Sequence, residues 1–221
     1  MTIQIYGFPF SVSVRRVLVA LKELDVPYEL VNVDVTKGEN RAPEVLAVQP
    51  FGQIPYLRDT EDDFTLYESR AIARYIVDKY DKDGKSGLIP KGLKAAAKFE
   101  QAVSVELTKY DPHVMELAFE LYVKPSFFKQ EPDEAAVTKH RTALEKTLDV
   151  YENVLKKQKY LAGDSITLAD LFHLPLGTLL IESAQFDILT IDQRPNVQRW
   201  WKDMSSRPAW DVVKADNSPF P

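Results

Sequence analysis

The sequence predicts an α/β plus all-α fold, in which an α/β domain is followed by a helical bundle. Apolar residues in positions 1–81 change repeatedly between the two-residue period of strands and the wider spacing of helices. The rest of the chain shows only helical spacing, and a total of 221 residues suits one large domain or two small ones. We therefore expect a first domain at 1–81, a linker rich in Gly, Pro and Lys at 82–92, and an all-helical domain at 93–221.

The first domain should begin with a strand, a helix and a second strand. Residues 3–5 form the core of the first strand, and a turn leads into a helix from Val12 whose outer face carries Arg15 and Arg16. Pro27 ends that helix, and residues 28–34 alternate at the period of a strand. A strand, a helix and a strand in this order predict a parallel pair with a right-handed crossover.

The remainder of the first domain contains a hairpin between two helices. We expect a short helix at 43–48, strands at 54–57 and 64–67 joined by an acidic turn, and an amphipathic helix at 69–80. The resulting order, β-α-β-α-β-β-α, is the thioredoxin-like arrangement.

The second domain should consist of helices throughout. One long apolar pattern runs over residues 99–122 with a bend at Pro112, and another runs over 144–155. Two further helices that open with proline are expected at 195–206 and 208–214.

The segment 166–181 is apolar on every side, which predicts a buried central helix. Thr167 is its natural N-cap, because Asp170 follows three residues later as in a capping box. The segment is too short and too interrupted to span a bilayer.

The composition excludes several classes of function. Without cysteine the chain has no disulfide, no Cys-ligated zinc and no thiolate nucleophile of its own. The three histidines form no H-E-x-x-H motif, so we expect no metal. A net charge of −5 with no basic half argues against nucleic acid or a membrane as partner. The N-terminus lacks a signal-peptide pattern, and we expect a cytoplasmic protein.

Three positions in the first domain carry groups that could bind a small peptide. Ser11 precedes a helix, where it is either a plain N-cap or a hydroxyl donor to an anion at the helix N-terminus. Pro55 is either an edge-strand proline or part of a cis peptide that turns the backbone of Ile54 outward to pair with an extended peptide. Glu68 and Ser69 are either a capping pair or holders of an ammonium and a carboxylate. Taken together, these groups describe a site for a small acidic peptide with a thiolate.

Six segments resemble the glutathione transferases, and most closely their phi class of plants and fungi. They are S-V-S-V-R-R-V-L (11–18), K-G-E-N-R (37–41), P-F-G-Q-I-P (50–55), Y-E-S-R-A-I (67–72), D-S-I-T-L-A-D (164–170) and R-P-N-V-Q-R-W-W (194–201). They occur in order and with proper spacing over nearly the whole chain.

The resemblance implies a role for each matching position. Ser11 would be the catalytic serine that hydrogen-bonds the sulfur of glutathione, although Ser13 two residues later could compete for that role. Glutathione would be held by Asn40 and Arg41 at its glycine end, by Gln53 and Ile54 at its cysteinyl part, and by Glu68 and Ser69 at its γ-glutamyl end. The class often has His or Gln in place of Asn40 and Lys in place of Arg41, so weaker or shifted contacts are expected there.

The implied reaction joins the glutathione thiolate to a small apolar electrophile, with reduction of organic hydroperoxides as a further activity. The electrophile site would be lined by Phe8 or Phe10 and by Met115, Phe119 and Tyr122, for each of which a core position is the alternative. Phe51 is a large apolar residue in a loop and by itself would be an ordinary surface aromatic. The resemblance implies a homodimer in which the helical domain of the second subunit buries it.

Three other functions fit the same fold. One is a non-catalytic carrier of hydrophobic ligands, and another is a structural module like the transferase-like domain of the translation elongation factor one B gamma subunit. The third is a glutathione-dependent thiol reductase. The reductase is disfavoured because the cysteine-type enzymes have Cys at the position of Ser11.

Overall fold

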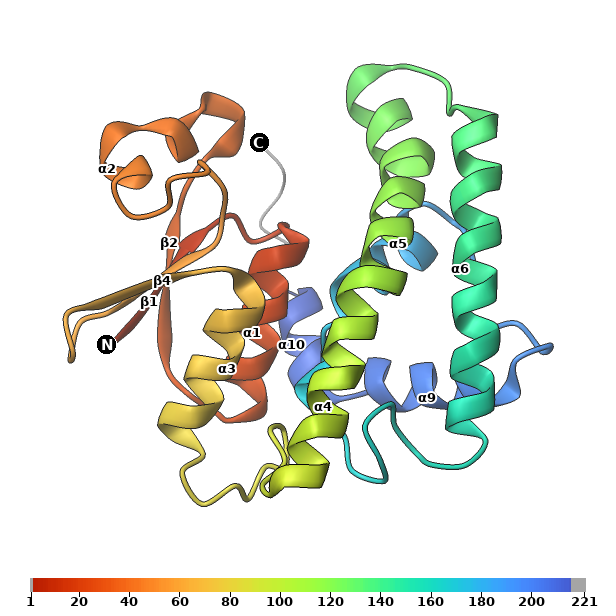
Figure 1. The fold of residues 1–221 in the computed structure, drawn as a ribbon. Coiled ribbons are helices and arrows are strands. Elements are labelled where there is room, and N and C mark those ends of the chain that lie inside the picture. Colours follow the sequence, from red (N-terminus) through yellow and green to blue (C-terminus); the bar gives the residue numbers. More distant parts are fainter. Residues whose placement is uncertain (1, 216–221) are drawn as a thin grey trace. The chain divides into compact units, whose positions relative to one another are not determined.

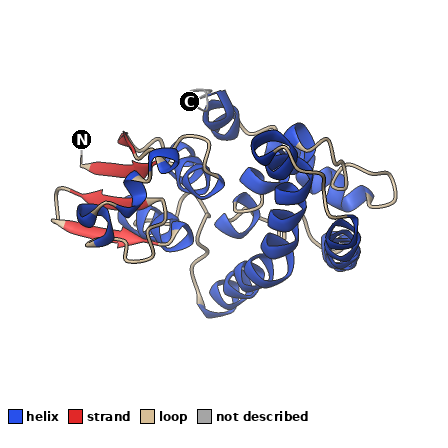
Figure 2. Cartoon of the chain, turned by 90° about the horizontal axis from the view of Figure 1, so that it is seen from above, coloured by secondary structure: helices blue, strands red, loops and turns tan. Residues whose placement is uncertain are grey.

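The computed structural model describes residues 2–215, which group into two compact units. Residues up to Ile89 together with those from Pro208 form the first unit, and Pro90–Arg207 form the second. All the strands drawn belong to the first unit, and the second is built of helices and loops (Figure 1, Figure 2). This confirms the predicted α/β plus all-α fold.

The first unit is built around a four-stranded mixed sheet in the order β2-β1-β3-β4. Its strands are β1 (Ile3–Gly7), β2 (Tyr28–Asn32), β3 (Tyr56–Asp59) and β4 (Phe64–Tyr67). β2 is parallel to β1, whereas β3 is antiparallel to both β1 and β4, as the crossover and the hairpin predict. β3 begins two residues later than expected, because Pro55 has no N–H to contribute to the ladder.

Helices α1 (Val12–Glu23) and α3 (Ser69–Tyr80) pack against each other in the first unit. Two short 3₁₀ turns, η1 (Val35–Lys37) and η2 (Glu39–Arg41), and a single-turn helix α2 (Pro43–Leu46) cross between β2 and β3. The two periodic helices match their predicted bounds closely, whereas the loop before α2 is more ordered than its sequence suggests.

Helix α10 (Pro208–Ala215) belongs to the first unit and not, as its helical pattern predicts, to the helical domain. It packs against α1. Trp210 and Val213 give it an apolar face that is buried. Amphipathicity predicts that such a face is covered but does not say by which element.

The second unit begins with a nearly continuous helical run. It comprises α4 (Leu93–Val105), the π-helical turn η3 (Glu106–Tyr110), α5 (Asp111–Ala118) and the π-helical segment η4 (Phe119–Phe128). The change of helical geometry at η3 lies just before Pro112, where the sequence predicts a bend. α6 (Glu134–Leu155) returns against α5, and α9 (Pro195–Ser205) packs on α6.

The predicted central helix at 166–181 is wrong as a single helix. It forms α7 (Leu168–Leu171), a turn, α8 (Leu174–Thr178) and a π-helical turn η5 (Leu179–Ser183). Pro175 explains the break, because it cannot donate the backbone hydrogen bond to Leu171 that a continuous helix requires. The predicted burial is confirmed, since residues 167–178 are all buried.

The start of α7 has the predicted capping box. The backbone N–H of Thr167 donates to Asp170 Oδ2 over 2.9 Å, and the structure forms both reciprocal bonds of the motif. Asp170 also accepts from the backbone of Leu161 and from the indole of Trp200, each over 2.9 Å. This carboxylate therefore joins three segments of the second unit at its centre.

Candidate functional site

Four loops of the first unit leave the sheet at one end. β1 leads from Gly7 toward Ser11, and the strand register places Tyr6 opposite Tyr56 and Tyr56 opposite Tyr67. The start of β3 and the end of β4 therefore lie at the same end of the sheet as the end of β1. The backbone N–H of Val33 donates to Gly7 O over 3.1 Å, so the loop after β2 also starts there. This topology brings every predicted glutathione-binding segment to one edge.

Ser11 is the N-cap of α1, as predicted. Its backbone is extended, with φ −62° and ψ 124°, and its Oγ accepts from the backbone N–H of Val14 over 3.4 Å. The side chain is only partly buried. Because the hydroxyl accepts in this bond, its own proton can be donated to a ligand that lies at the helix N-terminus.

Helix α1 starts in close contact with the loop before β3. A methyl group on Gly7 would lie 2.5 Å from Val14 Cγ2 and 3.7 Å from both Ile54 and Pro55. Only glycine leaves room for that approach. The Ile54–Pro55 peptide bond is cis, as one of the two alternatives for this proline requires. Gln53 beside it is exposed and Ile54 is partly buried.

Asn40 joins two loops of the candidate site. Its Nδ2 donates to Gly52 O over 2.7 Å. Gly52 has φ +62°, and a methyl group there would lie 3.3 Å from Asn40 O. The side-chain amide of Asn40 thus holds the loop that carries Gln53, whereas the neighbouring Arg41 side chain is exposed.

Asp34 orders the loop that carries Asn40 and Arg41. It caps η1 by accepting from Thr36 N over 2.9 Å and from Thr36 Oγ1 over 2.6 Å, and Lys37 Nζ lies 2.9 Å from its other oxygen. These hydrogen bonds lower the pKa of Asp34 to about 2. The bond from the Thr36 side chain has the largest effect, and the bond from Lys37 has the next largest.

The stability of this loop should depend on pH in the acid range. Because the folded-state pKa of Asp34 lies below its ordinary value, its stabilisation is complete above about pH 4 and is lost as the pH falls toward 2. Asp34→Asn should lose stability at neutral pH and should fall less steeply in acid. Melting temperatures measured across this range test the expectation, with Asp83→Asn as an exposed control. Parallel curves for the wild-type protein and Asp34→Asn would contradict it.

Glu68 and Ser69 occupy the junction of β4 and α3. Glu68 has φ +73° and ψ 107°, an unusual conformation for a residue other than glycine, and its side chain is exposed. Strained backbone of this kind occurs preferentially at functional sites. Ser69 is buried, with 6% of its surface exposed. It is the first residue of α3 and therefore lies at the end where the N–H groups have no partner within the helix.

Arg16 is a contact of this site that the sequence analysis missed. We expected it on the outer face of α1, yet it is 2% exposed, and its Nη1 donates to Ser69 Oγ over 3.0 Å. A charged residue between apolar ones gives no local sign of being buried. What could have indicated its burial is its position among Val14, Val17 and Leu18, which are buried on the same helix.

The residues predicted to line an electrophile site differ in their accessibility. Phe8 is 7% exposed and belongs to the core of the first unit, whereas Phe10 is partly exposed with the Arg15 guanidinium 5.1 Å above its ring. In the second unit Met115 and Phe119 are 40% and 39% exposed. Tyr122 is partly buried and its ring lies 6.0 Å from that of Phe127. Phe10 and these three side chains can therefore reach a ligand, each within its own unit.

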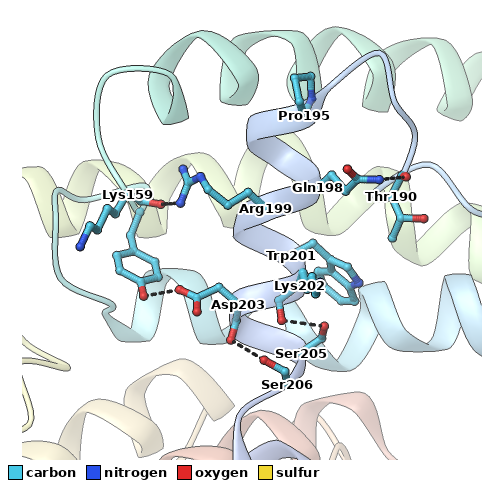
Figure 3. Close-up of a pocket in the computed structure, with 11 residues that line it drawn as sticks. Lys159, Thr190, Pro195, Gln198, Arg199, Trp201, Lys202, Asp203, Ser205 and Ser206 are labelled. Carbon is cyan, nitrogen blue, oxygen red and sulfur yellow. Dashed lines mark hydrogen bonds between the residues drawn. The ribbon is translucent and has the colours of Figure 1, made fainter.

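The second unit also has a wide groove of about 1130 Å³, lined by Lys159, Tyr160, Thr190, Pro195, Gln198, Arg199, Trp201, Lys202, Asp203, Ser205 and Ser206 (Figure 3). Its polar groups bond mainly to the protein. Arg199 donates to the carbonyls of Lys159 and Leu155 over 3.1 and 3.2 Å, and the Tyr160 hydroxyl donates to Asp203. None of the predicted site residues lies in it, so we assign it no ligand.

Two family models match the chain. The N-terminal domain of glutathione S-transferases matches residues 1–78, and the C-terminal domain matches residues 110–208. The chain belongs to the glutathione S-transferase family. Glutathione S-transferase F10 of Arabidopsis thaliana, a member of this family, is 42% identical over 99% of both chains.

Solved structures agree with this assignment. Glutathione transferase F2 from Populus trichocarpa has a TM-score of 0.89 at 38% identity and covers 96% of this chain and 97% of its own. Glutathione S-transferase I from maize, in complex with an atrazine glutathione conjugate, has a TM-score of 0.90 at 32% identity over 100% of both chains. The F-type relatives place the chain in the phi class, as its motifs predict. Within residues 2–215, no helix is long and apolar enough to cross a membrane.

Proposed function

We propose that the chain joins the thiolate of glutathione to apolar electrophiles, with the Ser11 hydroxyl donating to the sulfur. The observation that carries this proposal is the convergence of four loops at one end of the sheet, which brings Ser11, Ile54, Glu68 and the loop of Asn40 to a common edge. Members of the family have been solved with glutathione derivatives bound. We also propose the cytoplasm as its location.

The γ-glutamyl end of glutathione would bind at the start of α3. Ser69 Oγ already accepts from Arg16 over 3.0 Å, so its own proton can be donated to the ligand carboxylate. The free N–H groups and the dipole of α3 favour the same negative charge. The exposed carboxylate of Glu68 would hold the ammonium group of that end. Gln53 and the backbone of Ile54 would pair with the cysteinyl part, and Asn40 and Arg41 would contact the glycyl end.

The chemistry follows from the thiol pKa. A free thiol has a pKa of about 8.5 and is mostly protonated at neutral pH, whereas the thiolate is the nucleophile. A hydroxyl donor and the N-terminus of α1 stabilise the anion more than the neutral thiol. The electrophile held beside the sulfur is attacked, the new bond to carbon forms, and the leaving group departs with the electron pair. No side chain of the protein becomes covalently attached, which is consistent with a chain without cysteine.

Turnover of a chlorinated nitroarene with glutathione tests this proposal. We expect a rate well above the uncatalysed one, together with slower reduction of an organic hydroperoxide. Absence of both activities across a panel of electrophiles, in a protein that still binds glutathione, would overturn it.

A carrier of hydrophobic ligands is the second candidate, and one cavity favours it. A pocket of about 280 Å³ lies between α4 and α6 and is lined mainly by apolar side chains, among them Ala102, Val105, Val150, Val154 and Leu161. An apolar fluorescent dye that binds with defined stoichiometry but does not compete with glutathione would support this use. Val154→Trp should fill the pocket and remove such binding.

Arg41 should contribute to glutathione affinity but not to the chemical step. Its exposed guanidinium can pair with the glycyl carboxylate, which is far from the sulfur. Arg41→Ala should therefore raise the KM for glutathione severalfold and leave kcat at saturation nearly unchanged. Steady-state kinetics measure both values, and Arg58→Ala offers an exposed arginine on the sheet as control. A large fall in kcat at constant KM would show that its role is misassigned.

The chain should form a homodimer in which Phe51 is buried. Phe51 is 65% exposed and contacts the ring of Tyr67 with centroids 6.1 Å apart. A single exposed aromatic is common on protein surfaces, so the expectation rests on the family, in which this loop meets the helical domain of a second subunit. Sedimentation of the wild-type protein should give twice the mass of 25.2 kDa, and Phe51→Ser should shift the equilibrium toward monomer. A wild-type monomer at micromolar concentration would contradict this.

A further inference from the structure

Two histidines of the second unit face each other across a helix pair. His113 on α5 and His140 on α6 have their Nδ1 atoms 3.2 Å apart and their ring centroids 5.4 Å apart. Both side chains are partly exposed, so solvent and small ions can reach them. α5 and α6 pack against each other, which places the two side chains on neighbouring helices. Neither histidine takes part in the proposed reaction of glutathione.

The separation of the two nitrogens suits a shared metal ion. Imidazole nitrogens bind zinc at about 2.0–2.1 Å. For two nitrogens 3.2 Å apart, bonds of that length would give an N–metal–N angle of about 100–106°. The tetrahedral angle is about 109°, so the spacing of the two nitrogens is compatible with tetrahedral coordination of one ion. The alternative is a hydrogen bond, in which one Nδ1 carries the proton and the other accepts it.

Two lysines, Lys109 and Lys139, lie near enough to His113 for their charges to act on it. Their positive charges repel a cation, and we therefore expect micromolar rather than nanomolar affinity.

We propose that His113 and His140 form a binding site for a divalent transition-metal ion of the zinc, nickel and copper group, which links α5 to α6. Imidazole favours these ions over magnesium and calcium, which prefer oxygen ligands. No group of three or more His, Cys, Asp or Glu side chains able to hold a metal occurs in residues 2–215, so water would complete the coordination. The third histidine cannot compete, because His173 is 0% exposed and bonds to Tyr151 and Ala169.

A titration with Co²⁺ tests the site without relying on transferase activity. The untagged protein in buffer free of thiols and chelators should bind one equivalent per chain, with visible absorption bands that report ligand geometry. Zn²⁺ should displace the Co²⁺, and it should raise the melting temperature in a way that a chelator reverses. Binding should weaken as the pH is lowered, because protons compete with the metal for the imidazole nitrogens.

Single substitutions assign the ligands. His113→Gln and His140→Gln should each weaken Co²⁺ binding by at least about tenfold, since even the loss of an outer-shell partner costs that much. Lys139→Gln is the matched control on the same surface, and it should bind equally well or more tightly because a repelling charge is gone. Circular dichroism verifies that each variant is folded. Lack of stoichiometric Co²⁺ binding, or binding that survives both histidine substitutions, would show that the pair is only a hydrogen bond.

Discussion

Replacing Ser11 by alanine should reduce the rate of glutathione conjugation near pH 7 by about 10- to 150-fold. A hydrogen bond from a neutral donor to a charged acceptor contributes about 1.5–3 kcal/mol, which corresponds to that range. Glutathione should still bind, because the other proposed contacts come from Asn40, Gln53, Ser69 and their neighbours. The pH profile of the variant should move to higher pH, since the thiol then ionises with less help from the protein.

The capping role of Ser11 predicts a different outcome. If the hydroxyl serves only Val14 N, the variant loses about 1 kcal/mol of stability while its pH profile stays in place. Rate against pH, measured together with a melting curve, separates the two roles. Ser13→Ala is the matched control, as a partly buried serine in the first turn of the same helix. Full activity of Ser11→Ala at pH 6.5 combined with loss in Ser13→Ala would assign the sulfur contact to Ser13.

Asp170→Ala should strongly destabilise the second unit. The carboxylate is 0% exposed and accepts from the backbone of Leu161 and Thr167 and from the indole of Trp200, each over 2.9 Å. The Thr167 hydroxyl also donates to it over 3.0 Å, so removing the carboxylate leaves four donors without their acceptor, at a cost of about 3 kcal/mol or more. For a protein of this size the melting temperature should fall by about 6–12 °C.

Two further variants sharpen that test. Asp170→Asn keeps the size of the side chain and one acceptor oxygen, so it should lose less stability than alanine. Asp164→Ala removes an exposed aspartate that accepts from Lys159 N over 3.2 Å, and it should change the melting temperature little. Equal effects of Asp170→Ala and Asp164→Ala would mean that the buried hydrogen bonds contribute no more than surface ones.

Local sequence signals predicted those parts of the chain in which neighbouring residues decide the structure. α1 and α3 have amphipathic spacing, and the acidic turn between β3 and β4 predicted their hairpin. The capping box of Thr167 and Asp170 was visible because its two partners stand three residues apart. The sequence left open whether the peptide bond before Pro55 is cis or trans, and in the folded chain it is cis.

The candidate site was predictable as a set of positions but not as an arrangement. Its motifs pointed to Ser11, Glu68 and Ser69, whereas the strand register of β1, β3 and β4 is what brings these loops to one edge. The Asn40 side chain looked like a ligand contact, and the structure shows that it also ties its loop to Gly52. Such a bond joins residues far apart in sequence, and no local pattern encodes it.

By itself the sequence determined the fold class, the periodic helices and the family, because these depend on composition, spacing and motifs along the chain. Only the tertiary structure decided that Arg16 is buried against Ser69 and that α10 packs on α1. In both cases the deciding partner is distant in sequence. The break in the apolar segment has a local cause by contrast, because Pro175 lacks the backbone donor that a continuous helix needs. Periodicity shows that a face must be covered, and only packing shows what covers it.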